Sequence, residues 1–319
     1  MEYEYFEDEI VSCETIGEFE DEYVYDVEVN ELESHSFFAN DLLVHNSNYV
    51  SFEEVLMKCD WKGTPKEFIQ RFYNEFLNEY LNKCFEIYSA KTGTENIQSF
   101  ELENICDSGI WLAKKKYVYN PIWKDPGIDI ESLTNITAKG VEIVQSSSSI
   151  YVRNTLKNLL KYILDKKRDF SITEFTAILR KYKSEYILKD IEEICMASAI
   201  GDYEKHVLQD QEKLVLDKGC PIHVRAAAIH NYMVNSSKYK KKYPLIRSGE
   251  KVKYYMAKNT REEENVFAFI PGAFPVEIAP PIDHDVQFNK SIVMPINRFI
   301  EAMGYASISP KLSSSTQLF

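Results

Sequence analysis

The chain has 319 residues, of which 45% are hydrophobic and 13% aromatic, enough for two domains with their own cores. No apolar run approaches the ~20 residues of a membrane span, and the acidic start at Met1 lacks the basic and apolar regions of a signal peptide. The six cysteines are scattered without a close pair, which argues against a disulfide framework or a zinc site and favours a reducing cytoplasm.

The net charge of −13 is unevenly distributed. Residues 1–46 hold 15 Asp and Glu and neither Lys nor Arg, whereas the remainder holds all 37 basic residues against 35 acids. A short segment with charge of one sign does not easily bury enough surface to fold alone. It therefore resembles half of a domain that associates with a basic complement.

The first predicted element is a half-buried strand at residues 23–29, where apolar and polar side chains alternate. Two apolar strands, at residues 37–38 and 42–44, then bracket a turn at Asn40-Asp41. His45, Asn46 and Ser47 follow directly. The pattern thus predicts a β-hairpin that ends in three reactive side chains.

These three side chains suggest cleavage of the backbone. The amide of Asn46 can attack its own carbonyl carbon, which closes a succinimide ring and cuts the chain after that residue. His45 can transfer protons in this step because the unperturbed imidazole pKa lies near 7. The Ser47 hydroxyl can hold an acyl group while the bond is broken.

Residues 24–29 and 35–46, followed by Ser47, resemble the two C-terminal motifs of an intein. The resemblance implies a self-splicing element of the Hint β-fold that ends at Asn46. It also implies that Asp26 assists the nucleophilic steps and that His35 acts with His45 in proton transfer. The alternative is a plain β-hairpin with two surface histidines.

The chain opens with Met1 and shows no N-terminal splicing motif, so we interpret residues 1–46 as the C-terminal half of a split intein. In familiar split inteins the C-terminal half is the basic one, and the acidic segment here departs from that pattern. The alternative is a solvated acidic tail, for which Tyr3, Tyr5 and Phe6 are too apolar.

Beyond the junction, residues 47–52 alternate like another strand. A capping box at Thr64 and Glu67, with Pro65 first in the helix, predicts a long amphipathic helix that ends near Ala90. We expect its aromatic stripe to lie in the core. Strands are predicted at residues 100–106 and 109–119, meeting near residues 107–109.

The second of these strands contains Lys114, Lys115, Lys116 and Tyr117. Three lysines in an apolar strand are costly unless some face a polyanion, and a tyrosine ring offers a flat partner for sugar or phosphate. The alternative is a solvated surface run.

The rest of the chain is mostly helical in prediction. Helices are expected at residues 150–165, 171–182, 186–198 and 221–234, strands at residues 251–257 and 266–271, and a last helix at residues 292–303 interrupted near Pro295. A basic loop lies at residues 238–243.

Taken in order, several segments resemble the C-terminal part of a family B DNA polymerase of the T-even phage type. They are residues 47–50, 111–119, 139–149, 220–225 and the terminal Gln-Leu-Phe. The resemblance implies an α+β chain: an all-β intein fragment (1–46), a palm remnant (47–140) and a mostly helical thumb (141–319).

This resemblance also implies roles for side chains. Lys114, Lys115 and Tyr117 would hold the backbone of the primer strand without reading its sequence. The tail residues Gln317, Leu318 and Phe319 are candidates for docking into a sliding clamp, and the alternative is a disordered tail.

In that family an Asp-Thr-Asp turn precedes the serine that matches Ser47 and carries carboxylates for two Mg²⁺ ions. Here His45-Asn46 precedes it instead. We therefore expect the aspartates on a partner polypeptide, no polymerase activity in this chain alone, and trans-splicing without a cofactor. The joined enzyme would bind primer-template DNA and dNTP, in the cytoplasm and without a membrane partner.

Two other functions stay open. One is a DNA-binding or clamp-tethering subunit whose first 46 residues are an inactive intein remnant. The other is an acidic interaction protein without a role in nucleic-acid binding.

Overall fold

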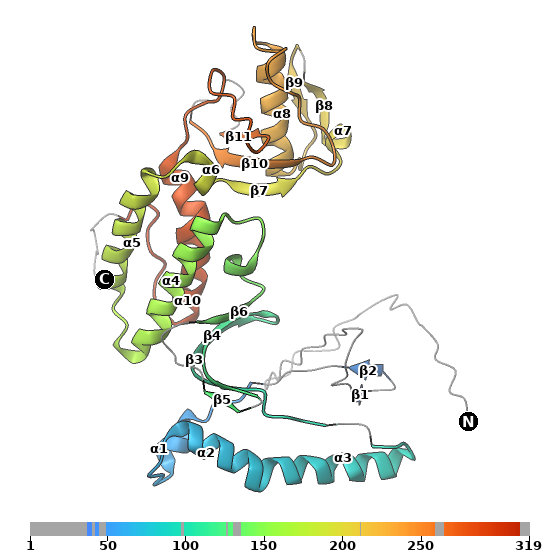
Figure 1. Ribbon diagram of the computed structural model, residues 1–319, viewed down its shortest axis with the longest axis vertical. Coiled ribbons are helices and arrows are strands. Elements are labelled where there is room, and N and C mark those ends of the chain that lie inside the picture. The colour runs from blue at the N-terminus through green and yellow to red at the C-terminus, as the bar shows by residue number, and fades with distance from the viewer. Residues whose placement is uncertain are drawn as a thin grey trace.

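The computed structural model describes residues 37–39, 42–44, 49–96, 99–125, 127–129, 135–210, 212–258 and 265–312. Helices alternate with small antiparallel sheets along this part of the chain, which is the predicted α+β class. The elements are strung along one long axis (Figure 1). Helices α1 to α3 lie at one end, a β-sheet and a helical layer follow, and helix α8 lies at the other end.

The predicted hairpin at the end of the acidic segment is confirmed where it can be described. Strand β1 (Phe37–Ala39) pairs antiparallel with β2 (Leu42–Val44), with Phe37 opposite Val44 and Ala39 opposite Leu42. The strand expected at residues 23–29 lies outside the described residues.

The long helix after the junction forms as predicted. It consists of α2 (Pro65–Phe72), the π-helical turn η1 (Tyr73–Leu77) and α3 (Asn78–Thr92). The Thr64 backbone N–H donates to Glu67 Oε2 at 2.7 Å, and the Glu67 N–H donates to Thr64 Oγ1 at 3.2 Å, which confirms the capping box. The strand predicted at residues 47–52 is wrong, because residues 49–52 are irregular and lead into the short helix α1 (Glu53–Lys58).

The prediction that this helix is part of the core is also wrong. Among the described residues between 49 and 104, every side chain is half-buried or exposed, including Phe76 and Tyr80 at 56%. Periodicity identified the apolar face correctly, but it carries no information on whether the chain supplies a surface to cover that face.

The central sheet is built on one hairpin. Strand β3 (Asn104–Ala113) pairs with β4 (Lys116–Lys124), and β4 also pairs with β5 (Ile128–Asp129) and β6 (Thr137–Lys139). The predicted break at residues 107–109 is wrong. A register shift between Cys106 and Ser108 absorbs the extra residue Asp107 as a bulge, and β3 continues through Gly109.

The larger core lies between the sheet and a helical layer. Its helices are α4 (Ile150–Lys166), α5 (Ile172–Ile187) and α10 (Met294–Ala302). The 3₁₀ turn η2 (Glu142–Val144) precedes α4, and a second one, η3 (Lys167–Asp169), follows it. Helix α5 lies in the predicted region, and Ser171 caps it by accepting from the Glu174 N–H.

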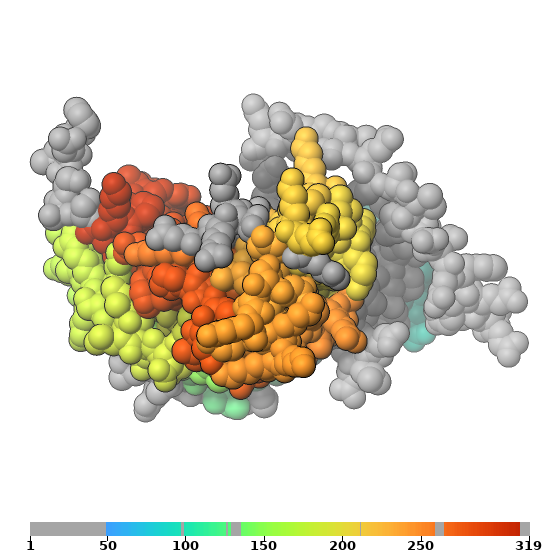
Figure 2. Space-filling view, turned by 90° about the horizontal axis from the view of Figure 1, so that it is seen from above, coloured from blue at the N-terminus to red at the C-terminus, as the bar shows by residue number. Residues whose placement is uncertain are grey.

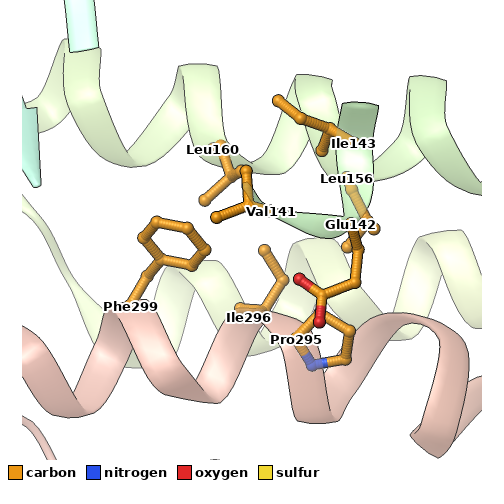
Figure 3. Close-up of a pocket in the computed structure, with 8 residues that line it drawn as sticks. All are labelled: Val141, Glu142, Ile143, Leu156, Leu160, Pro295, Ile296 and Phe299. Carbon is orange, nitrogen blue, oxygen red and sulfur yellow. The ribbon is translucent and has the colours of Figure 1, made fainter. Parts of the chain in front are cut away.

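Figure 3 shows how the chain leaves the sheet and enters this core. Val141 points between α4 and α10, where Leu156 and Leu160 meet Ile296 and Phe299. The residues that line this depression leave almost no room for a water molecule (≈ 0 Å³). The segment after β6 is therefore fixed by packing, and Arg298 Nη1 donates to Glu142 Oε1 at 2.5 Å at its rim.

The last helical stretch is longer than predicted. Helix α9 (His284–Phe288), the π-helical turn η4 (Asn289–Val293) and α10 follow without a break. Pro295 does not interrupt the stretch, because the π-helical turn precedes it and Pro295 falls in the first turn of α10, where a missing N–H is tolerated.

A second core surrounds helix α8 (Ile222–Asn235). Strand β10 (Lys251–Met256) lies between β11 (Val266–Phe269) and β7 (Met196–Ala199) in a three-stranded sheet. The elements α7 (Tyr203–His206), β8 (Val207–Asp210) and β9 (Leu214–Leu216) pack at its side. Figure 2, seen from this end, shows the α8 segment (orange) between the β8–β9 region (yellow) and α5 (yellow-green).

The helix predicted at residues 186–198 is wrong. Helix α5 ends at Ile187, the four-residue α6 (Ile191–Ile194) follows, and Ala197 then pairs with Lys253 on β10. The strand depends on a partner more than fifty residues away, which local periodicity does not report. Gln287, fully buried on α9, joins the two cores by donating to the Ile194 carbonyl at 3.0 Å and accepting from the Met256 N–H at 2.8 Å.

The described cysteines differ in burial. Cys195 and Cys220 are buried, Cys84 and Cys106 are half-buried, and Cys59 is exposed. The five described cysteines are free. Along the same described ranges, no helix is long and apolar enough to cross a membrane.

Candidate nucleic-acid interface and ligation junction

The two lysines predicted to contact DNA, Lys114 and Lys115, lie at a hairpin tip and not within a strand. Ala113 on β3 pairs with Lys116 on β4, so Lys114 and Lys115 form the turn. Lys115 has a φ of 59°, and Lys114, Lys115 and Lys116 are all exposed. Ammonium groups at an exposed tip avoid the desolvation cost that lysines would carry inside a strand.

Tyr117 begins the sheet surface behind this tip. On β4 it lies opposite Trp111 of β3 and opposite Lys139 of β6. Its ring centroid is 6.3 Å from that of Trp111 and 6.0 Å from that of Tyr119. An aromatic surface bordered by lysines therefore lies on one sheet, a combination that suits a sugar-phosphate backbone.

Lys139 is a site residue that sequence reasoning missed. Its pairing with Tyr117 depends on a strand of three residues. No local sequence pattern predicts such a short strand. The pairing brings a fourth lysine to the same end of the sheet as Lys114, Lys115 and Lys116.

Gly140 holds the hairpin tip in place. Its φ is +64°, and a Cβ at this position would lie 2.0 Å from the Lys115 carbonyl oxygen. Any side chain would therefore both strain the backbone and collide with the turn. The close approach fixes the position of Lys115 relative to β6 and, through Val141, relative to the core.

Tyr49 connects the junction segment to this surface. Its ring centroid lies 5.1 Å from that of Trp111, 5.3 Å from that of Tyr117 and 5.8 Å from that of Tyr119. Partial burial, followed by a hydrogen bond with Tyr117, raises the pKa of the Tyr49 hydroxyl. Burial is also the main cause of the raised pKa of Tyr119. We call Tyr49, Trp111, Tyr117 and Tyr119 the aromatic cluster.

The bond predicted to break, between residues 46 and 47, is three residues upstream of Tyr49. Residues 45–48 lie outside the described residues, so Tyr49 is the first described residue after the predicted junction.

The other predicted site residues fall outside the described residues. These are the splicing candidates Asp26, His35, His45, Asn46 and Ser47, and the tail residues Gln317, Leu318 and Phe319. Their roles stay predictions. Strand β2 ends at Val44, directly before His45, and pairs antiparallel with β1.

The described residues do not hold a metal site. Among them, no group of three or more His, Cys, Asp or Glu side chains is arranged to bind a metal ion. The location of the Mg²⁺ ligands on a partner polypeptide stays a prediction.

Comparison with known proteins adds no assignment. Neither a protein-family model nor a curated protein matches this chain.

Proposed function

We propose that this chain is the C-terminal part of a split DNA-directed DNA polymerase, which protein trans-splicing joins to its N-terminal part. Residues 1–46 serve as one intein half, and the residues from Ser47 onward become part of the polymerase. In the joined enzyme this part grips primer-template DNA.

The packing of Tyr49 in the aromatic cluster carries this proposal. It places the residue that follows Ser47 by two positions against Tyr117, beside the lysine tip. A polypeptide joined at Ser47 thus arrives next to the surface that would hold the primer. A polymerase needs that proximity, because its metal-binding carboxylates must act at the primer end.

Joining proceeds by acyl transfer. The partner's intein half forms an ester or thioester at the upstream junction, and Ser47 Oγ attacks its acyl carbon and releases the partner's nucleophile. The side-chain nitrogen of Asn46 then attacks the Asn46 carbonyl carbon, which forms a succinimide and frees the Ser47 amine. This amine takes over the acyl group, the Ser47 hydroxyl is restored, and a normal peptide bond results.

Within the joined enzyme the hairpin neutralises phosphates. Lys114 and Lys115 supply positive charge at an exposed tip, and Tyr117 offers its ring to the sugar-phosphate backbone. These contacts carry no base information, so they suit an enzyme that must accept every primer sequence.

The test is to mix the purified chain with its N-terminal partner and to follow ligation on a denaturing gel. Asn46→Ala should block release of the intein and leave association intact. Ser47→Ala should abolish the fused product. If both variants yield as much fused product as the unaltered chain, splicing at this junction is wrong.

A non-splicing DNA-binding subunit would give a different result. It would yield no fused band with any partner, while salt-dependent binding to primer-template DNA would persist.

A further inference from the structure

The chain between the junction and the central sheet is unusual in its burial. Within residues 49–96 and 99–104 no side chain is buried, whereas the described residues from Ile105 onward build two cores. The uncovered segment nevertheless carries a high density of aromatic residues. Aromatic side chains normally bury large areas, so their exposure indicates that a covering surface belongs elsewhere.

The rings form a ladder along one face of the helix α2–η1–α3. Their centroids are 6.3 Å apart for Phe68 and Phe72, 5.4 Å for Phe72 and Phe76, and 6.0 Å for Phe76 and Tyr80. We call these four residues the aromatic ladder. Ile87, seven residues beyond Tyr80 and therefore on the same helical face, is also 56% exposed.

The exposed apolar area on this face is as large as that of many known interaction patches. The helix covers residues 65–92, about 40 Å in length. Phe76, Tyr80 and Ile87 alone leave roughly 300 Å² of side-chain area in water, the range at which apolar patches mark interaction sites.

We infer that the aromatic ladder is the docking surface for the N-terminal polypeptide of the split polymerase, and that it engages this partner before ligation. The inference rests on the proposed function and adds to it a second contact between the two polypeptides, separate from the one between the intein halves.

Continuity with the junction identifies this occupant. Phe52, five residues after Ser47, packs its ring 6.1 Å from Phe68 and 5.5 Å from Phe72. A polypeptide joined at Ser47 therefore starts within a few residues of the first rung of the ladder. Figure 1 shows α1 and α2 at this same end, with α3 extending away from the rest of the molecule.

The charge of the segment indicates what kind of surface it meets. Residues 49–96 carry eight acidic and six basic side chains, nearly balanced, in contrast to the strongly acidic segment before them. Long-range electrostatic attraction to the partner therefore comes from residues 1–46. The aromatic ladder binds an apolar surface at short range. Two such contacts on one pair of polypeptides reinforce each other through effective concentration.

The test uses the full chain with Asn46→Ala and Ser47→Ala, which forms the complex without joining it. Hydroxyl-radical footprinting compares Phe76 and Tyr80 in this chain alone and in complex with the N-terminal polypeptide. We expect their reactivity to fall severalfold in the complex.

A variant pair provides the control. Phe76→Asp with Tyr80→Asp adds charge on the ladder and should remove the protection elsewhere on that face, for example at Ile87. Asn74→Asp with Asn82→Asp adds the same charge roughly 200° around the helix from the ladder and should leave protection unchanged. Both pairs alter exposed positions, so both chains should fold.

The outcomes separate this inference from the proposed function. A complex in which Phe76 and Tyr80 stay as reactive as in the free chain would overturn the docking surface and leave trans-splicing intact. A chain that forms a dimer by itself, with the ladder protected, would show that a second copy is the occupant. Absence of any complex would contradict both proposals.

Discussion

At the scale of the residue, the hairpin tip separates two lysines that look equivalent in sequence. Lys115 occupies the left-handed region with φ 59°, whereas Lys114 does not. Alanine tolerates that conformation no worse than lysine, since both carry a Cβ. Truncation at either position therefore removes charge without adding backbone strain, which makes these two residues suitable probes of DNA contact.

Lys114→Ala and Lys115→Ala should each weaken binding of the chain to primer-template DNA. The slope of the logarithm of the binding constant against the logarithm of the salt concentration should become shallower by about 1 for each lysine, because one phosphate contact is lost. Fluorescence anisotropy at several salt concentrations measures this slope. Lys218→Ala, at an exposed turn before α8, is the control and should leave the slope unchanged. Equal slopes in all three variants would show that the hairpin does not contact DNA.

A second residue-scale prediction concerns His230 on α8. The ring is 1% exposed, lies 5.6 Å from that of Phe267, and its Nε2 is 3.1 Å from the Pro244 carbonyl. Burial is the main reason that the pKa of His230 falls below its ordinary value. The unfolded chain then binds this proton at a higher pH than the folded chain does, so acidification below about 6.5 favours unfolding.

His230→Gln, which keeps a donor for Pro244, should therefore reduce the loss of stability between pH 7 and pH 5.5. Urea denaturation at both pH values gives the difference in unfolding free energy. A variant whose stability falls as much as that of the unaltered chain would show that His230 does not titrate in this way.

At the scale of the element, the central hairpin is held from two sides. The aromatic cluster fixes its strands to the junction segment, and Gly140 fixes its tip to β6. Its position therefore depends on contacts with segments that are distant in sequence. These contacts hold the hairpin in place although its tip is exposed.

Gly140→Ala should destabilise the fold more than Gly219→Ala does. Both glycines have positive φ, +64° and +92°, so both changes carry the ~1–2 kcal/mol backbone penalty of a Cβ. Only at Gly140 does the new Cβ collide with a backbone atom, whereas at Gly219 the space is open. We expect an additional loss of at least ~1 kcal/mol for Gly140→Ala in thermal or urea unfolding. Equal losses would contradict the close approach to Lys115.

Sequence patterns predict some of these elements correctly and miss others. The capping box at Thr64 and Glu67 predicts the start of the long helix at Pro65 correctly, because a cap is a local hydrogen-bonding pattern. The turn at Lys114-Lys115 was missed, since Gly109 looked like the better turn residue and the bulge at Asp107 is set by the partner strand. Pairing of β7 and of β6 with distant strands was missed for the same reason.

Only some residues of the candidate site could be predicted from the sequence. Lys114, Lys115 and Tyr117 were identified from residue type and do lie at one end of one sheet. Lys139, Gly140 and Tyr49 join them only through tertiary contacts, and no periodicity could have grouped them.

At the scale of the whole molecule, both charge and burial change along the chain. The charge changes after residue 46, and the first buried side chain after Tyr49 is that of Ile105. The first 46 residues carry a charge of −15, and the remaining residues carry about +2. The described residues from 49 to 104 are uncovered, and those beyond them form the two cores. An acidic segment followed by a segment without buried side chains is what we would expect of the proposed polymerase, severed inside its catalytic domain.

The most direct measurement is intact-mass spectrometry of the unaltered chain incubated with its N-terminal partner. The account predicts two species: a fused polypeptide that continues from the partner into Ser47, and a released peptide of residues 1–46. This peptide should be one water lighter than the same peptide with a free carboxyl terminus, because Asn46 ends in a succinimide. An intact bond after Asn46, with no fused polypeptide, would contradict the account.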